Sequence, residues 1–462
     1  MAKKKQIELT IEEKLQNALV PKEEQPYKIP NNWCWTYLTK GMAECWDKYR
    51  KPINATERNK RLGNIPYYGA TGQVGWIDDY LTDEHLVLIG EDGAPFLDLL
   101  KNKAYIIKGK SWVNNHAHIL KSFYDEVGNK YLCNYLNVFN YKGYINGTTR
   151  LKLTQKNLDI IPIPLPPINE QQRIVNIIES LFAKLDRAKE LIENTLAQFE
   201  QNKMAILHKA FTGELTVKWR KENNINNIKD VSYIEKLPYI VPNGWYWDKL
   251  ENITIRIVDG DHNPPAKEKE KTSYIMLSAQ NIGYSSFINM DKVRYLSKDN
   301  FDKCHKRTCL EDGDILFSSV GSIGNAMVYR EKENDKITFQ RSVTIIKTKI
   351  NPYYLRYVLL SPYCQQIFKT ESIGTAQKGF YIKQMKSLIV PVPTIEEQQE
   401  IVNILDKLLA KYNKIKNLEQ QLGKIELLKK AILAKAFRGE LGTNNPDEES
   451  AENLLKEILA EK

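Results

Sequence analysis

The sequence lacks the local signatures of membrane, secreted and metal-binding proteins. No run of eighteen apolar residues is present, which excludes a membrane-spanning helix. Residues 6–19 follow a basic start but never form an apolar core, so we expect no signal peptide. The six cysteines form no CxxC pair, and their one cluster, Cys304-His305 with Cys309, has too few ligands for a structural zinc site. We therefore predict free thiols, no metal and a cytoplasmic location.

Motifs of catalysis are also missing. The sequence has no GxxxxGK[ST] phosphate loop, and its six histidines show no HExxH or triad-like grouping. Asn263-Pro264-Pro265-Ala266 is similar to the Asn-Pro-Pro-aromatic motif of adenine methyltransferases, but it lacks the aromatic residue that stacks a flipped base. No glycine-rich cofactor loop accompanies it. We expect a non-catalytic chain that binds no cofactor itself.

Length and charge indicate a multidomain protein with a polyanionic partner. A chain of 462 residues predicts two or three domains. The net charge is +10. Lysine and arginine that neutralise phosphates release counterions, so this excess favours a nucleic acid as partner.

An internal repeat organises the sequence. Residues 164–177 (PLPPINEQQRIVNI) recur as residues 391–404 (PVPTIEEQQEIVNI). Residues 205–215 (AILHKAFTGEL) recur as residues 431–441 (AILAKAFRGEL). The lengths between these motifs differ by one residue, whereas the segments before them differ in length and diverge in sequence. The repeat therefore predicts two helices of constant length and two variable globular heads.

The helices have an apolar seam at near-heptad spacing, which is typical of coiled-coil partners. We expect about 44 residues from Ile168 to Phe211, a rod of about 65 Å. Thr394 and Glu397 predict a capping box, and Gly213 and Gly439 predict left-handed caps. The two copies are expected to pair with each other, antiparallel. The predicted pairing residues are Ile178, Leu181, Leu185, Ile192, Leu405, Leu408, Tyr412 and Ile415.

Both heads open on a similar tryptophan-rich segment, residues 29–35 (IPNNWCW) and 241–247 (VPNGWYW), which we interpret as core. Strand-like runs cover residues 86–89, 105–107, 315–317 and 342–346, with glycine-rich turns at 68–75 and 320–325. The turns suit phosphate contacts, although an ordinary tight turn is the commoner explanation.

Several polar clusters could contact base edges, since Asn and Gln bind adenine bidentately and Arg binds guanine. The candidate DNA-binding residues are Thr71, Gln73, Asn114, Asn115, His116, Arg150, Asp261, His262, Asn263, Gln280, Asn281, Ser322, Asn325, Gln340, Arg341, Thr375, Gln377 and Lys378.

The duplicated EQQxIV and AILxKAFxGEL motifs resemble the conserved regions of type I restriction specificity subunits. The IPxxWxW start of the heads, residues 259–262 (DGDH), and residues 313–317 (GDILF) followed by 321–324 (GSIG) are similar to that family's target-recognition domains. The resemblance spans nearly the whole chain. Its helical motifs are the more specific ones.

The resemblance implies a DNA sequence-specificity subunit that is not itself an enzyme. Each head would bind one half of an asymmetric bipartite site on double-stranded DNA, and the helices would set the spacer and dock two methyltransferase subunits. Those partners use S-adenosylmethionine to methylate adenine-N6, and restriction/translocase subunits use ATP and Mg²⁺. The family does not fix which residues contact bases.

The fold class implied is α+β, with two mixed α/β target-recognition domains separated by two long antiparallel coiled-coil helices in a pseudo-twofold internal repeat. The predicted boundaries are 1–25 (N-terminal helix and linker), 26–166 (head 1), 167–220 (spacer helix 1), 221–238 (exposed connector), 239–393 (head 2), 394–441 (spacer helix 2) and 442–462 (tail helix). Two alternatives remain open at this point: a stand-alone two-headed repressor, and a coiled-coil scaffold whose heads bind protein.

Overall fold

The computed structural model describes residues 9–225, 237–332, 336–374, 377–413 and 416–461. The chain divides into two compact units. Unit 1 comprises Met1–Glu193 with Leu418–Lys462, and unit 2 comprises Asn194–Asn417. Each unit therefore combines one head with parts of the long helices. No helix in the described ranges is long and apolar enough to cross a membrane.

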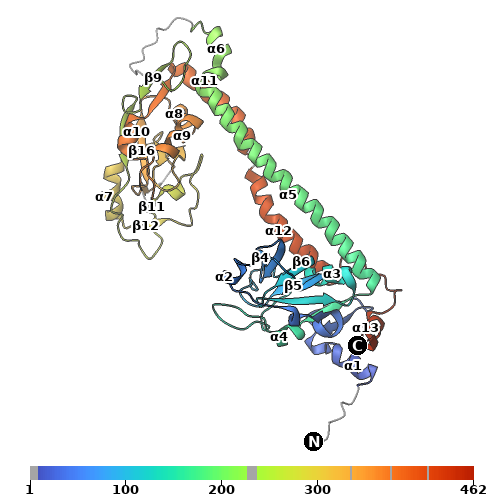
Figure 1. Cartoon of the computed structure of the whole chain (residues 1–462). Helices are drawn as coiled ribbons and strands as arrows, with labels where there is room; N and C mark the ends of the chain where they lie inside the picture. The colour runs from blue at the N-terminus through green and yellow to red at the C-terminus, as the bar shows by residue number, and fades with distance from the viewer. Residues whose placement is uncertain (1–8, 226–236, 333–335, 375–376, 414–415, 462) are drawn as a thin grey trace. The chain divides into compact units, whose positions relative to one another are not determined.

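The long helix α5 spans Ile168–Phe211, 44 residues, as the repeat predicts (Figure 1). The second copy is described as α11, Ile395–Asn413, and α12, Lys416–Ala436. The predicted pairing residue Ile415 lies outside the described residues. Gly213 and Gly439 have φ values of 78° and 72°, which confirms the left-handed caps.

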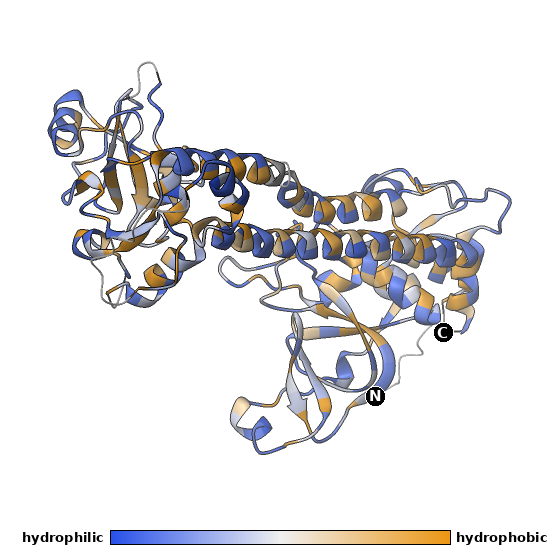
Figure 2. Cartoon of the chain, turned by 90° about the horizontal axis from the view of Figure 1, so that it is seen from above, coloured by the Kyte–Doolittle hydropathy of each residue, from blue (hydrophilic) through white to orange (hydrophobic). Residues whose placement is uncertain are grey.

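In unit 1 the first part of α5 packs against α12. Ile174 and Ile178 share a buried core with Leu433 and Phe437. Ion pairs join Asp186 to Lys429 and Lys189 to Glu426, so the partner number falls as the number in α5 rises, and the helices are antiparallel. Figure 2 shows apolar residues recurring between hydrophilic ones along these helices.

In unit 2 the last part of α5 shares a core with α11. Leu207, Ala210 and Phe211 lie in one buried cluster with Ile401 and Leu405. Of the other predicted pairing residues, Leu181, Leu185, Ile192 and Leu408 are half-buried. Tyr412 lies in α11.

Head 1 contains a mixed sheet in the order β2-β7-β5-β6-β3-β4 (Figure 1). All its pairs are antiparallel except β3 with β6. Helix α3, Asp125–Leu136, buries Leu132 and Leu136 in the core against Val87 and Leu120 of the sheet. The strands are β2 Ala43–Cys45, β3 Ile65–Gly69, β4 Gly72–Ile77, β5 Thr82–Gly90, β6 Ala104–Val113 and β7 Ala117–Ser122.

Strands β1, Cys34–Tyr37, and β8, Pro162–Leu165, pair where head 1 meets α5. The short helices of this unit are α1 Ile11–Ala18, α2 Ala55–Arg58, α4 Gln155–Asp159 and α13 Ala451–Glu461. Helix α1 begins with a capping box formed by Thr10 and Glu13, and it packs against α13. The tail helix thus packs on its own protein, since Leu455 and Leu459 are buried.

Head 2 contains an antiparallel sheet in the order β10-β16-β13-β14, and a second sheet in the order β12-β11-β15. Strand β9 pairs with β17 next to α11. The strands are β9 Tyr246–Lys249, β10 Thr254–Asp259, β11 Ile275–Leu277, β12 Arg294–Tyr295, β13 Ile315–Ser318, β14 Ala326–Val328, β15 Ile337–Phe339, β16 Val343–Thr348 and β17 Ile389–Val392. The helices of unit 2 are α6 Val217–Glu222, α7 Lys298–Thr308, α8 Pro352–Leu359, α9 Pro362–Glu371 and α10 Ile382–Ser387.

The repeated motifs meet at a buried carboxylate in each unit. In unit 1, Glu170 accepts hydrogen bonds from Trp33 Nε1 (2.8 Å), Thr443 Oγ1 (3.0 Å) and Asn444 Nδ2 (2.9 Å). This contact joins the start of head 1, the start of α5 and the segment after α12. The tryptophans at both entrances are buried, which confirms their interpretation as core.

In unit 2 the equivalent carboxylate is Glu397, which accepts from Trp245 Nε1 (2.8 Å) and Thr216 Oγ1 (2.6 Å) and pairs with Arg220. Two predictions are wrong here. Arg220, at the junction of spacer helix 1 with a connector that was expected to be exposed, instead has its guanidinium buried against Glu397. Thr394 Oγ1 accepts a hydrogen bond from the Glu397 amide, but the Glu397 carboxylate does not accept one from the Thr394 amide, so the capping box is incomplete. Trp245, Thr216 and Arg220 donate to that carboxylate instead.

Candidate nucleic-acid interface

Three loops meet at one end of the head 1 sheet. They are residues 90–94 after β5, the turn 114–116 between β6 and β7, and the hairpin 146–152. Backbone bonds connect them: Leu153 N donates to Glu91 O (2.7 Å), Glu91 N to His116 O (2.8 Å) and Gly93 N to Leu151 O (3.1 Å). We call this arrangement the three-loop site of head 1.

Head 2 repeats the same framework. The loops are residues 319–324 after β13, the turn 340–342 between β15 and β16, and the described parts of 373–379. Phe380 N donates to Ser319 O (2.8 Å), Ser319 N to Ser342 O (2.9 Å) and Gly321 N to Lys378 O (3.3 Å). Reciprocal bonds join Ile373 to Gly379, as they join Asn146 to Lys152 in head 1. These bonds define the three-loop site of head 2.

The shared framework matches residues whose side chains differ. Asn115 corresponds to Arg341, Arg150 to Gln377, and Asp92 to Val320, as the matched backbone bonds require. The main-chain bonds are thus the same in both heads while the side chains change. The same backbone framework therefore carries different functional groups in head 1 and head 2.

A half-buried acid, Asp47, supports the loops of the head 1 site. Asp47 Oδ2 is 2.6 Å from His118 Nδ1 and 2.7 Å from Arg50 Nη2, and Asp47 Oδ1 accepts from Ile119 N (3.0 Å). Burial alone would raise the pKa of Asp47, but the hydrogen bond from His118, the Ile119 amide and the Arg50 charge outweigh it and lower that pKa. Arg50 also forms an ion pair with Glu91. The backbone carbonyl of Glu91 accepts the bond from Leu153 N that connects two of the loops.

Asp47, His118 and Cys45 form a compact group of metal-ligand types, with their ligand atoms within 4.8 Å of one another. Both nitrogens of His118 are occupied, since Nε2 lies 2.8 Å from Leu153 O. Burial and the neighbouring Asp47 raise the pKa of Cys45 to about 12, so its thiol stays protonated. The group therefore braces the loops as a hydrogen-bonded network.

Asp259 holds the equivalent place in head 2. Its Oδ1 accepts from Thr344 Oγ1 (2.7 Å), and Thr344 corresponds to His118. His262 lies 3.9 Å away, at the same i,i+3 spacing as Arg50 from Asp47. Burial raises the pKa of Asp259, because the Thr344 hydrogen bond and the more distant charges do not offset it.

The head 1 site gathers part of the predicted set. Asp92 Oδ1 lies 2.8 Å from His116 Nδ1 and accepts from Arg150 Nη2 (2.7 Å). Asn114 is buried and accepts from the His116 amide (2.8 Å), so it shapes the turn, whereas Asn115 is exposed. Thr71 and Gln73 are exposed where β3 turns into β4, beside the turn because Asn114 N donates to Tyr68 O.

The head 2 site is a hollow of about 420 Å³ that brings more of the predicted residues together. His262, Gln280, Ser322, Gln340, Arg341 and Gln377 all line it. Asp261 is fixed below by backbone bonds to Phe339 and Arg341, and its Oδ1 accepts from Asn263 N (2.7 Å). Lys378 is exposed, and Asn325 Nδ2 donates to Ile282 O. Thr375 lies outside the described residues.

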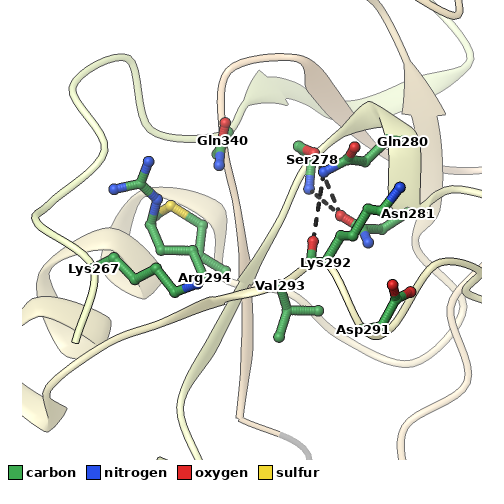
Figure 3. A pocket seen from close by; sticks show the side chains of 10 residues that line it. Lys267, Ser278, Gln280, Asn281, Asp291, Lys292, Val293, Arg294 and Gln340 are labelled. Carbon is green, nitrogen blue, oxygen red and sulfur yellow. Dashed lines mark hydrogen bonds between the residues drawn. The ribbon is translucent and has the colours of Figure 1, made fainter. Parts of the chain in front are cut away.

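A second hollow, of about 390 Å³, shares Ser278, Gln280 and Gln340 with the first (Figure 3). Lys267, Lys292 and Arg294 add positive charge to it. Asn281 also lines it, but this buried amide accepts from Ser278 and donates to the carbonyls of Ile288 and Asn289. The Asn281 side chain therefore forms its hydrogen bonds within its own loop and holds that loop in place.

Sequence reasoning missed Asp92, Asp47 and His118. Asp92 follows a strand and is unremarkable until the hairpin carrying Arg150 lies beside it. Asp47 could have been found, since it precedes Asp259 by the same 212 residues that separate Pro30 from Pro242.

The two heads thus share one backbone framework, and the long helices contribute apolar residues to the core of each unit. Comparison with known proteins identifies the family. The family model "Type I restriction modification DNA specificity domain" matches residues 36–198 and 262–426. The chain therefore belongs to the family of type I restriction-modification specificity subunits.

Two relatives illustrate the similarity. The EcoBI specificity subunit of Escherichia coli is 33% identical over 67% of this chain and 66% of its own length. A putative specificity subunit of Haemophilus influenzae is 28% identical over 79% of this chain and 85% of its own. The chain thus spans slightly less than two thirds of the first relative.

A solved chain from work on assembly and conformational transition of the type I R-M system has the same fold. It superposes with a TM-score of 0.62, at 17% identity, over 90% of this chain and all of the other.

Proposed function

We propose that each head binds one half of an asymmetric, bipartite site on double-stranded DNA. The observation that carries this proposal is the three-loop site, with one backbone framework in both heads and different exposed side chains. Because head 1 presents Asn115 and Arg150 where head 2 presents Arg341 and Gln377, the two half-sites should differ in sequence. For the heads we retain the boundaries 26–166 and 239–393.

The long helices are proposed to set the spacer between the half-sites and to dock two methyltransferase subunits. The antiparallel contacts between α5 and α12, with apolar residues inside and ion pairs at the edge, support a stiff spacer. Work on the solved relative concerned assembly of a type I complex, which agrees with a subunit that binds others. Restriction/translocase subunits would join the same complex.

The chemistry belongs to those partners. S-adenosylmethionine would be bound by the methyltransferase subunits, and ATP and Mg²⁺ by the translocase subunits. This chain's own part is to select the DNA sequence, and the positive charge of the second hollow suits phosphates beside the bases. A cytoplasmic location would follow from that role.

The test is genome-wide mapping of N6-methyladenine in cells with and without the gene. The proposal expects one split motif to lose its methylation when the gene is deleted. Exchange of residues 30–164 for the head of another specificity subunit should change one half of the motif and keep the other. A motif that changes in both halves, or no motif at all, would contradict the proposal.

The spacer claim has its own test. Equal insertions in both long helices should alter the spacer and leave the bases of both halves intact. Unchanged spacing in an assembled, active complex would show that the helices do not set it.

A further inference from the structure

Arg150 and Asp92 form an exposed ion pair at the centre of the head 1 site. Arg150 Nη2 donates to Asp92 Oδ1 (2.7 Å), and the Arg150 side chain is 63% exposed while that of Asp92 is 20% exposed. Within the described part of the chain, Nε and Nη1 of Arg150 and Oδ2 of Asp92 have no hydrogen-bond partner. Nη2 has a second N–H besides the one given to Asp92, and both parallel forks of a guanidinium include Nη2. One fork, Nη2 with Nη1 or with Nε, and the acceptor Asp92 Oδ2 therefore remain available to a ligand.

The pair is held in place from both sides. The hairpin that carries Arg150 is closed by reciprocal bonds between Asn146 and Lys152. Gly147 has a φ of 96°, and a Cβ there would lie 2.4 Å from Arg150 O, so only glycine permits this turn. His116 Nδ1, 2.8 Å from the same Asp92 oxygen, fixes the carboxylate.

We propose that Asp92 and Arg150 together read one G·C base pair in the half-site of head 1. Guanine presents two acceptors, O6 and N7, to a bidentate arginine, and its cytosine presents the N4 amino donor to a carboxylate. The remaining fork of Arg150 and Oδ2 of Asp92 match that pattern, with two parallel N–H donors next to one acceptor. This inference rests on the proposed function, because it assigns bases to the same site.

A phosphate contact by Arg150 is the competing role, and the carboxylate argues against it. Asp92 would repel a phosphate placed on the same guanidinium, whereas a neutral base edge meets no such repulsion. Bracing by Asp92 also fixes the direction of the fork, which a bidentate base contact needs and a phosphate contact does not.

Head 2 supplies a variant that should fold. Its framework carries Val320 and Gln377 at the positions of Asp92 and Arg150, so Asp92→Val with Arg150→Gln places in head 1 a combination that the same backbone already supports. We expect this double variant and Arg150→Ala to assemble with the partner subunits and to lose discrimination at one G·C pair.

The experiment measures binding of the assembled methyltransferase complex to duplexes in which each position of the wild-type motif is replaced in turn. Wild type should disfavour replacement of one G·C pair in the head 1 half by about 5- to 150-fold, and the variants should lose that preference at that position alone. The salt dependence of binding should stay unchanged.

Arg330→Ala is the matched control. Arg330 is 61% exposed and pairs with Asp312 at 2.7 Å, but at the opposite end of β13 from the head 2 site. It should leave both halves of the motif unchanged.

The inference is overturned if the head 1 half contains no G·C pair, or if Arg150→Ala weakens all duplexes equally and lowers the salt dependence, as loss of a phosphate contact would. Either result leaves the proposed function standing. Absence of any split motif in wild type would instead sink the proposed function.

Discussion

Asp47 and Asp259 occupy equivalent places beneath the two sites, yet their environments shift their pKa values in opposite directions. The carboxylate of Asp47 is paired with Arg50 and His118, whereas Asp259 accepts from the Thr344 hydroxyl. The same structural position therefore stabilises one head through charge and the other through a neutral contact.

Asp47→Asn should destabilise head 1 by about 1–2 kcal/mol at neutral pH, because Arg50 loses one of its two carboxylate partners and keeps the other, Glu91. Urea unfolding, with hydrogen exchange resolved for each unit, measures this. The lost protection should be confined to unit 1.

The same variant gives a pH test. Because the folded state lowers the pKa of Asp47, its contribution is present above the unfolded pKa and is lost as pH falls through the folded value. The stability difference between wild type and Asp47→Asn should shrink below about pH 4. A difference that grows on acidification would contradict this account.

Asp259→Asn should leave head 2 equally stable or more stable at pH 7, within about 1 kcal/mol, since the amide can still accept from Thr344. The raised pKa means that ionisation of Asp259 opposes folding, so wild type should gain stability as pH falls through the folded value. Thermal unfolding from pH 7 to pH 4 measures this gain, which the variant should lack.

Glu397→Gln should cost unit 2 about 3–5 kcal/mol, because Arg220 would keep a buried, unpaired charge. Glu170→Gln is the matched variant, and it should cost unit 1 only about 1–2 kcal/mol because all donors to Glu170 are neutral. Urea unfolding compares them. Equal losses would show that the Arg220 charge is compensated elsewhere.

Gly213→Ala should destabilise unit 2 by about 2 kcal/mol or more, since a positive φ disfavours alanine. The new Cβ would also lie 2.2 Å from Pro242 Cγ. Gly423→Ala in α12, where a Cβ meets nothing within 4 Å, should gain about 1 kcal/mol. Denaturant midpoints compare the two, and similar effects would argue against the collision.

The sequence predicted the helices and their caps well, because the repeat is nearly exact there. Ile168 and Phe211 bound α5 as expected, and Gly213 and Gly439 end their helices. It also singled out residues 114–116 and 340–341 as polar clusters, but it did not predict that they form turns. The sequence could not show that these two segments are equivalent, because the difference in residue number between equivalent positions of the two heads changes from loop to loop.

What escaped prediction depends on contacts between distant segments. Arg220 looks like part of a polar connector until Glu397 lies beside it. Asp92 gains a role only where the hairpin brings Arg150 to it. The loops of the two heads differ in length and in side chains, so a comparison of residue identities does not show that they share a backbone framework. The backbone hydrogen bonds do show it.

The division of the chain has a consequence for synthesis. Unit 2 is contiguous, Asn194–Asn417, whereas the core of unit 1 needs Leu433, Phe437 and Leu455. Domains generally fold as units while the chain emerges from the ribosome. Head 1 precedes head 2 along the chain, but its core is completed by residues that follow head 2, so unit 1 is expected to mature after unit 2.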